Sequence, residues 1–388
     1  MKKVVLAYSG GLDTSCAIKW LQDKGYDVVA MIANVGQGEN FDAIKERALK
    51  TGASKVHVLD LQTEFVSDYV FPAIRANAIY ENKYLLATAL SRPLIAKHQV
   101  EVAHKEKATA VAHGCTGKGN DQVRFETTIR LLDPKLEHIA PVRVWEFKTR
   151  DEEIDYAKKH KIPVNVTKKS PYSIDINVYG RSIECGVLED PWAEPPEEIY
   201  HYTVSPEKAP DKPTYIEIDF KDGNPTAIDG KIYEPLELIR KLNEIGGKNG
   251  VGRVDAIENR LVGIKSREIY ENPAGLILYL SHLEIESLVL DRETIHYKQL
   301  ISPKYAEMIY YGLWETPVKK QLDAYINETQ KDVTGTVRLK LYKGNCTVVG
   351  RKSKYSRYKL TLATYGDKDK FDQKMAEGFL KLWALPYQ

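Results

Sequence analysis

Short apolar runs alternate with amphipathic stretches along roughly the first 165 residues. The apolar runs predict strands at 3–8, 27–35, 55–61, 108–113 and 139–145. The stretches between them predict helices at 15–24, 41–50, 64–76 and 91–107, and another that a Thr149–Glu152 capping box opens. Because helices that join successive strands pack on the sheet, this order predicts a parallel sheet covered on both faces.

The pattern changes after about Val166. Two hairpins are predicted, at 215–220 with 227–233 and at 335–342 with 347–350, together with helices at 236–245 and 281–291. The proline-rich stretch 191–213 is expected to be a surface loop. The sequence therefore predicts an α/β protein with a parallel-sheet domain (1–165), an α+β domain (166–362) and a C-terminal helix (363–388).

The C-terminal helix carries an apolar stripe. Phe371, Met375, Phe379 and Leu382 recur at helical spacing, with Trp383 beside them. Such a stripe packs either on its own domain or on a neighbouring subunit, and the sequence leaves both interpretations open.

Composition narrows the classes of protein. The 56 Lys and Arg residues nearly balance 54 Asp and Glu residues in a chain of 388, so there is no overall basic field for nucleic acid. The stretch 276–290 contains His282, Glu284 and Glu286 and cannot span a membrane. The four cysteines form no Cys-x-x-Cys pair, which argues against zinc and disulfides and fits a cytoplasmic protein.

The strongest chemical signal lies between the first strand and the first helix. Two glycines allow a tight turn, and the hydroxyls and helix-opening amides around them can bind an anion. The Gly-Lys-Ser/Thr ending of a P-loop is missing, and so is the spacing of a dinucleotide-binding loop. This segment is similar to the pyrophosphate-binding loop of the ATP-pyrophosphatase families. Its residues are Ala7, Tyr8, Ser9, Gly10, Gly11, Leu12, Asp13, Thr14 and Ser15.

Two further loops follow predicted strands. Ala33 lies at the end of the second strand, and the fourth strand leads into 113–125, where three glycines accompany Thr116, Asn120, Asp121 and Arg124. Open α/β sheets bind ligands at the carboxyl ends of their strands, so both loops are candidate parts of one site.

These segments together resemble the argininosuccinate synthase family over most of the chain. The matching blocks are 7–15, 84–86, 91–93, 113–125, 180–184, 250–253, 257–260 and 266–271. The resemblance implies a carbon–nitrogen ligase of arginine biosynthesis that joins citrulline and aspartate and converts ATP to AMP and pyrophosphate with Mg²⁺. It also implies a homotetramer, with a nucleotide-binding domain, a synthetase domain and an oligomerisation helix in the three predicted regions.

The resemblance assigns binding roles residue by residue. ATP would be held by residues 7–15 with Ala33 and Gly114. Aspartate would be held by Thr116, Asn120 and Asp121. Citrulline would be held by Tyr84, Asn120, Arg124, Ser173, Ser182, Glu258 and Tyr270. Asp13 and Asp121 are the candidate catalytic residues, and Arg124 suits a carboxylate because a guanidinium binds it with two parallel hydrogen bonds.

Two points qualify the assignment of the citrulline and aspartate residues. Ile176 stands where the family has an acidic residue after Ser173, so that serine is aligned less securely than Ser182. Asp121 suits an ammonium group and could also help to remove its proton. No metal ligand is assigned.

Two other functions remain in competition. A tRNA-thiolating enzyme or lysidine synthetase would use a similar loop, and the basic run 351–359 could contact RNA, but thiolation generally needs paired cysteines. A non-enzymatic nucleotide-binding module would need the first loop only and leaves 116–124 unexplained. The glycine-rich run 246–253 follows a predicted helix, so it lacks the context of a P-loop.

Overall fold

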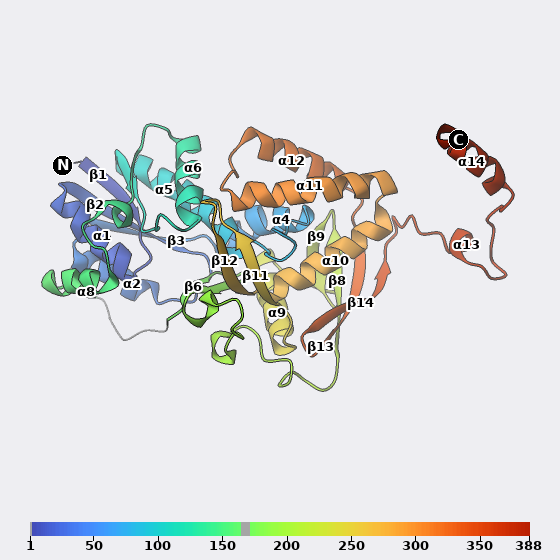
Figure 1. Ribbon diagram of the computed structural model, residues 1–388, viewed down its shortest axis with the longest axis horizontal. Helices are drawn as coiled ribbons and strands as arrows, with labels where there is room; N and C mark the ends of the chain where they lie inside the picture. Colours follow the sequence, from blue (N-terminus) through green and yellow to red (C-terminus); the bar gives the residue numbers. More distant parts are fainter. Residues whose placement is uncertain (1, 164–170) are drawn as a thin grey trace.

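The computed structural model describes residues 2–163 and 171–388 and divides them into two halves with a C-terminal arm (Figure 1). The first half is built on a five-stranded parallel sheet in the order β3-β2-β1-β4-β5. Its strands are β1 (Lys2–Ala7), β2 (Tyr26–Asn34), β3 (Lys55–Asp60), β4 (Ala110–Ala112) and β5 (Glu137–Ile139). Its helices are α1 (Leu12–Asp23), α2 (Phe41–Thr51), α5 (Ala87–Glu106), α6 (Asp121–Leu132), α7 (Pro141–Val144) and α8 (Arg150–Lys159).

The alternation of side chains along β1 shows why helices cover both faces of this sheet. Val4 and Leu6 pack with α1 and α2, whereas Val5 packs in the cluster that contains α5. Successive strand residues point to opposite faces, so an entirely apolar strand needs cover on both sides. The predicted doubly covered parallel sheet is confirmed.

One predicted strand is wrong. The run 139–145 was expected to be the fifth strand, but β5 ends at Ile139 and Pro141 opens α7. Proline has no N–H for a strand partner, whereas it fits the first turn of a helix. The capping box is confirmed, because Thr149 Oγ1 accepts a hydrogen bond from Glu152 N at 3.3 Å.

A segment between β3 and α5 crosses to the second half. It comprises α3 (Gln62–Glu64), a π-helix (Phe65–Val70) and α4 (Phe71–Arg75). Arg75 Nη1 donates to Asn224 Oδ1 at 2.6 Å, and Asn77 Nδ2 donates to the buried Glu286 Oε2 at 2.5 Å. This part of the first 165 residues therefore packs with the second half, and the predicted boundary at 165/166 lies outside the described residues.

The second half contains two sheets and four longer helices. One sheet has the order β10-β9-β8-β13-β14 and the other β11-β12-β7-β6. The strands are β6 (Ser173–Ile176), β7 (Arg181–Glu184), β8 (Thr214–Lys221), β9 (Asn224–Ile228), β10 (Lys231–Ile232), β11 (Arg253–Asn259), β12 (Lys265–Glu271), β13 (Gly335–Tyr342) and β14 (Asn345–Lys352). The helices are α9 (Pro235–Lys248), α10 (Pro273–Val289), α11 (Arg292–Tyr310) and α12 (Pro317–Thr329).

The hairpin predictions are confirmed as β8–β9 and β13–β14, and the two predicted helices correspond to α9 and α10. The sequence analysis did not predict α11, α12 or the β11–β12 hairpin. The stretch 191–213 has no strand, but it is not wholly a surface loop, because Ile199 and Thr203 are buried. Thr203 donates from both its amide and its hydroxyl to Glu271 Oε1, each at 2.8 Å.

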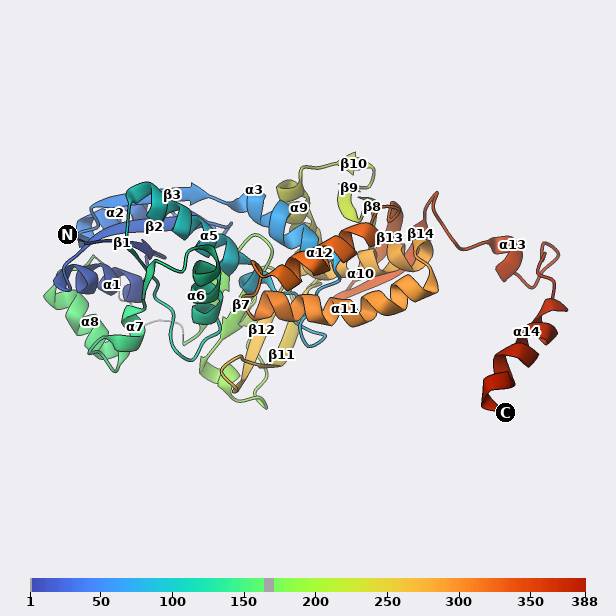
Figure 2. The same cartoon turned by 90° about the horizontal axis from the view of Figure 1, so that it is seen from above.

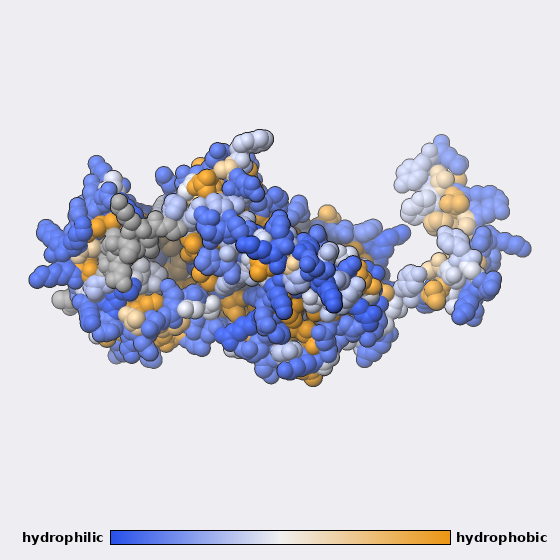
Figure 3. All heavy atoms as spheres, turned by 90° about the horizontal axis from the view of Figure 1, so that it is seen from below, coloured by the Kyte–Doolittle hydropathy of each residue, from blue (hydrophilic) through white to orange (hydrophobic). Residues whose placement is uncertain are grey.

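The C-terminal arm extends away from both halves and ends in α13 (Leu360–Ala363) and α14 (Met375–Ala384), as Figures 1 and 2 show. Its apolar side chains form an exposed patch on the arm in the space-filling view (Figure 3). Phe371, Met375, Phe379, Leu382 and Trp383 are between 52% and 74% exposed. The interpretation that this stripe packs on its own domain is therefore wrong.

The structure bears on the predictions about a membrane-spanning helix and about the cysteines. Within residues 2–163 and 171–388, no helix combines the length and apolar character needed to cross a bilayer. Cys16, Cys115, Cys185 and Cys346 are all free thiols.

Candidate functional site

The phosphate loop forms a turn that leads into the N-terminus of α1. Gly10 has φ +79°, a left-handed conformation that glycine adopts without strain, and Gly11 begins α1 with no side chain to cap it. The hydroxyls of Ser9 and Thr14 share a hydrogen bond of 3.1 Å. Below the turn, a hydrogen bond of 2.9 Å joins the hydroxyls of Tyr8 and Ser15. The first turn of α1 therefore presents N–H groups and hydroxyls at the carboxyl end of β1.

The loop after β4 lies directly against this turn. A Cβ added to Gly114 would lie 2.8 Å from Thr14 Cγ2, so only glycine allows this approach. His113 Nδ1 accepts from Cys115 N at 3.2 Å, and the other ring nitrogen lies 3.2 Å from Glu126 Oε1. The two loops that the sequence singled out are thus neighbours. Ala33 lies at the carboxyl end of β2 in the same sheet, and its carbonyl accepts from Gln37 Nε2 at 2.8 Å.

Asp121 opens α6 between two arginines. Its carboxylate accepts from Arg92 Nε at 2.7 Å and from Arg124 Nη1 at 2.9 Å. Burial opposes ionisation of Asp121, but the two guanidinium charges outweigh it and lower the pKa. Such a carboxylate is a weak base, so the geometry favours a binding role over proton removal. Arg92 also pairs with Asp175 at 2.9 Å and so connects this loop to β6.

One face of the β11-β12-β7-β6 sheet carries the four citrulline candidates of the second half. Asp175 is paired with Ser182, and Ser182 with Tyr270. Cross-strand partners share a face, and so do residues two apart along a strand. Ser173 and Glu258 therefore belong to the same face as these residues. Thr88 at the start of α5 reaches it, because the Thr88 and Ser182 hydroxyl oxygens lie 3.0 Å apart.

Glu258 is a buried carboxylate held by two tyrosines. Tyr270 donates to Oε2 and Tyr310 donates to Oε1, each at 2.7 Å. Burial raises the pKa of Glu258, and the two hydroxyls partly offset that rise because they stabilise the ionised form. Tyr84 stacks on Tyr270 with ring centroids 4.2 Å apart, and the Tyr84 hydroxyl accepts from Thr88 N at 3.0 Å. This cluster brings three predicted citrulline residues, Tyr84, Glu258 and Tyr270, into contact.

Glu153 is a buried carboxyl group that lies beside the phosphate loop. Glu153 of α8 is hydrogen-bonded to Asp13 in the first turn of α1. Burial raises the pKa of Glu153 to about 8, and the charge of Asp13 adds to the rise. Glu153 therefore holds its proton to a higher pH than an exposed glutamate does.

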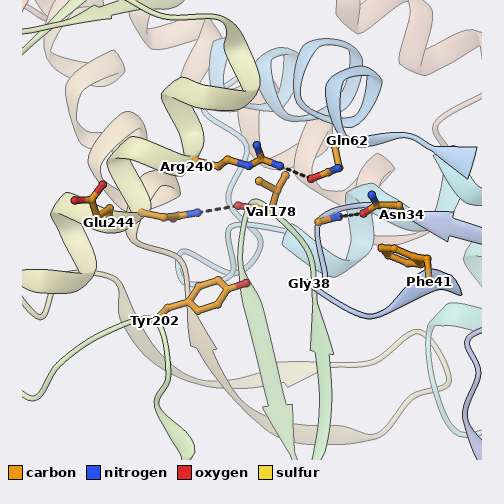
Figure 4. Close-up of a pocket in the computed structure, with 10 residues that line it drawn as sticks. Asn34, Gly38, Phe41, Gln62, Val178, Tyr202, Arg240 and Glu244 are labelled. Carbon is orange, nitrogen blue, oxygen red and sulfur yellow. Dashed lines mark hydrogen bonds between the residues drawn. The ribbon is translucent and has the colours of Figure 1, made fainter. Parts of the chain in front are cut away.

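A cavity of about 580 Å³ opens at the carboxyl end of β2, between the two halves (Figure 4). Arg240 and Glu244 of α9 line one side, and Asn34 and Phe41 line the other. Asn243 of α9 also lines the cavity. Residues 9–15 do not line this cavity. Val178 N donates to Val35 O at 2.8 Å, which helps to hold the halves together here. Within the second half, Asn243 Nδ2 donates to Val178 O at 2.7 Å.

The candidate site residues differ in their exposure to solvent, and three further residues that the sequence did not single out belong to the site. Ser173 and Thr116 are exposed, whereas Asn120, Arg124 and Glu258 are buried. The missed residues are Arg92, Glu153 and Tyr310. Arg92 lies within the matching block 91–93 and could have been chosen, since a buried helix with one arginine suggests a buried partner. The other two show no distinguishing pattern in the sequence.

Two family models together match nearly the whole chain. One, described as the arginosuccinate synthase N-terminal HUP domain, matches residues 3–163, and the other, the arginosuccinate synthase C-terminal domain, matches 172–388. A relative from Carboxydothermus hydrogenoformans named argininosuccinate synthase is 57% identical over 386 residues, or 99% of this chain and 96% of the relative. A relative of the same name from Geobacillus thermodenitrificans is 58% identical over 384 residues, or 99% of this chain and 94% of the relative.

Two solved structures match part of the chain. A predicted subunit of a tRNA methyltransferase from Methanocaldococcus jannaschii covers 40% of this chain and 75% of its own at 17% identity, with a TM-score of 0.28. A 4-thiouridine synthetase–RNA complex with bound ATP covers 41% of this chain and 40% of its own at 15% identity, with a TM-score of 0.31. Similarity this low supports no argument about function.

Proposed function

The chain belongs to the argininosuccinate synthase family, and we propose that it joins citrulline to aspartate while ATP is converted to AMP and pyrophosphate. The observation that carries this proposal is the contact between Gly114 and Thr14, which places a phosphate-binding turn beside the Thr116–Arg124 loop. An anion site next to paired ionic groups suits a reaction between a nucleotide and two amino acids.

The chemistry explains why both loops are needed. The ureido carbon of citrulline is a poor electrophile, because two nitrogens donate electrons into it and its oxygen is a poor leaving group. Attack of that oxygen on the α-phosphorus of ATP releases pyrophosphate and converts the oxygen into part of AMP, a good leaving group. The amine of aspartate then adds to the carbon, and AMP departs.

The first step needs donors already aimed at phosphate oxygens. We assign ATP to residues 7–15 with Ala33 and Gly114, because the N–H groups of the α1 terminus can hold the departing pyrophosphate. The Ser9 and Thr14 hydroxyls, which are hydrogen-bonded to each other, can turn to donate to a phosphate oxygen. Tyr8 supports the turn from below, since its amide donates to Met31 O at 2.8 Å.

The amino acids would occupy the ionic pocket beside this turn. We assign aspartate to Thr116, Asn120 and Asp121. We assign citrulline to Tyr84, Asn120, Arg124, Ser173, Ser182, Glu258 and Tyr270. Glu258 retains a second acceptor position on each oxygen beyond its bonds to Tyr270 and Tyr310, so it can also receive an ammonium group.

Mg²⁺ fits the donor set at the phosphate loop, where Asp13 is the nearest carboxylate. Among the residues that the structure describes, no group of three or more His, Cys, Asp or Glu side chains could hold a metal ion. We propose that Asp13 would help to hold a Mg²⁺ ion that accompanies ATP, and that the ion would supply positive charge to the phosphate oxygens.

Three further proposals concern organisation. We propose a homotetramer in which the exposed stripe of α14 packs on a neighbouring subunit, because an unpaired apolar helix surface is costly in water. We propose that 1–165 act as the nucleotide-binding domain, 166–362 as the synthetase domain and 363–388 as the oligomerisation segment. We also propose that the enzyme works in the cytoplasm.

Pyrophosphate release tests the function. ATP is supplied with citrulline alone, with aspartate alone and with both. We expect sustained release of pyrophosphate and AMP only when both amino acids are present, with argininosuccinate formed in equal amount. Release of ADP and orthophosphate, or release that ignores both amino acids, would contradict the proposal.

A further inference from the structure

We propose that Tyr310 is a positioning residue that ties the citrulline-side carboxylate of Glu258 to the aspartate-side loop at Asn120, so that the two amino-acid sites form as one unit. Tyr310 lies at the end of α11, far along the chain from both partners, and it is fully buried. This inference rests on the proposed function and adds a residue that no pattern in the sequence distinguishes.

The Tyr310 hydroxyl makes both connections at once. It donates to Glu258 Oε1 at 2.7 Å and accepts from Asn120 Nδ2 at 2.8 Å. A phenol has one hydrogen to donate and lone pairs to accept, so the two bonds do not compete. The amide of Asn120 cannot turn over without loss, because its Oδ1 accepts from Leu261 N at 3.0 Å.

The rest of Tyr310 holds Arg124. The Tyr310 carbonyl accepts from Arg124 Nε at 3.0 Å, and the guanidinium carbon lies 4.9 Å from the centre of the Tyr310 ring. A cation over an aromatic face is stabilised by the ring electrons. The chain just after Tyr310 also approaches α6 closely, since a Cβ on Gly312 would lie 2.6 Å from Arg124 Cα. Tyr310 therefore contacts Asn120, Arg124 and Glu258 through different groups.

These contacts connect the charge of Glu258 to the position of the loop. Burial raises the pKa of Glu258, and the Tyr310 hydroxyl counteracts this because it donates to the ionised carboxylate. If the hydroxyl is removed, Glu258 remains protonated to a higher pH and Asn120 loses a fixed acceptor. Both amino acids should then bind less well, whereas the phosphate loop is not in contact with Tyr310 and should be unaffected.

The variant Tyr310→Phe tests this with the full-length protein. Pyrophosphate release by the wild type with both amino acids is measured first. If the wild type releases none, the proposed function itself is refuted, and the role of Tyr310 is refuted with it. In the variant we expect the KM values for citrulline and aspartate each to rise about tenfold, because one hydrogen bond to a charged group is lost. The KM for ATP should stay within about twofold, and the acid limb of kcat/KM for citrulline should move to higher pH.

Tyr305→Phe is the matched control. Tyr305 is also fully buried on α11, and its hydroxyl donates to Asp323 Oδ1 at 2.7 Å, away from every candidate substrate residue. This variant should leave all three KM values and the pH profile unchanged. Equal changes in both variants, or a Tyr310→Phe enzyme with unchanged amino-acid KM values and an unmoved acid limb, would overturn the proposal.

Discussion

Arg92 Nε lies 2.7 Å from Asp121 Oδ2, so a helix of the first half holds the carboxylate that opens the aspartate-side loop. A second guanidinium, that of Arg124, lies 2.9 Å from the other oxygen. The pKa of Asp121 is lowered by these charges despite burial. Asp121 is therefore ionised throughout the physiological range, which fits an ammonium partner better than a proton acceptor.

Replacing Asp121 separates these two roles. For Asp121→Asn we expect the KM for aspartate to rise at least about tenfold, because a charged partner of the substrate ammonium is lost. The kcat at saturating aspartate should fall by less than about tenfold, whereas loss of a general base costs about 10²–10⁴ in rate. Steady-state kinetics at varied aspartate concentration distinguishes a role in binding aspartate from a role as general base.

Asp175→Asn is the control for that measurement. It removes the other ionic partner of Arg92 and leaves in place the residues that are assigned to bind the substrate aspartate. It should lower stability without a tenfold change in the KM for aspartate. A kcat for Asp121→Asn that falls a thousandfold at unchanged KM would show that Asp121 is the base.

Gly114 tests the contact between the two loops. In Gly114→Ala the new methyl group would lie 2.8 Å from Thr14 Cγ2, so the phosphate turn must shift. We expect the KM for ATP to rise about tenfold, since overpacking costs about 1–3 kcal/mol. Gly117→Ala in the same loop is the control, because its nearest neighbour would be 3.9 Å away, at Arg143. Equal KM values for ATP in both variants would refute the contact.

Glu153 predicts a pH dependence of stability. Its folded-state pKa is raised by burial and by Asp13, from 4.5 to about 8. The folded state therefore holds a proton that the unfolded chain releases, and the stability from this group is complete below pH 4.5 and is lost as pH rises to about 8. In Glu153→Gln that loss should disappear.

Urea midpoints at pH 5 and pH 8 measure this effect. The midpoint of the wild type should fall more between the two pH values than that of Glu153→Gln. Asp155→Asn on the same helix, whose side chain is 76% exposed, should behave like the wild type. The same pH dependence in all three proteins would show that Glu153 is not the group responsible.

The C-terminal arm predicts an assembly. Removal of residues 371–388 should lower the mass in solution from a tetramer to a smaller species, because the exposed apolar stripe of α14 is lost. Phe379→Asp with Trp383→Asp should do the same. Lys381→Glu, on the charged side of α14, should leave the mass unchanged. Light scattering gives the masses, and an unchanged tetramer after truncation would contradict the role of the arm.

Most of the first sheet could be predicted because β1, β2 and β4 are largely apolar runs, whereas β5 is only the three residues Glu137–Ile139 and the apolar run after it forms α7. The phosphate turn carries its own signal in Ser9-Gly10-Gly11. Helix α11 was missed because Pro303 interrupts its pattern and its surface is mostly polar. Helix α12 had a usable signal, since Thr316 caps it before Pro317.

The contacts that organise the site could not be predicted for a different reason. Tyr310 meets Glu258 across 52 positions of the chain and Asn120 across 190. Nothing in its local sequence separates it from the other 23 of the 24 tyrosines. The pairing of Asp13 with Glu153 is also made by folding, since α8 reaches the phosphate turn only when its buried side packs on Leu12 and Cys16.

Citrulline labelled with oxygen-18 in the ureido group tests the central claim most directly. If the phosphate turn holds the outer two phosphates of ATP while the ureido oxygen attacks the inner one, mass spectrometry should find the label in AMP and none in pyrophosphate. Label found in pyrophosphate, in orthophosphate or in water, with unlabelled AMP, would contradict the account.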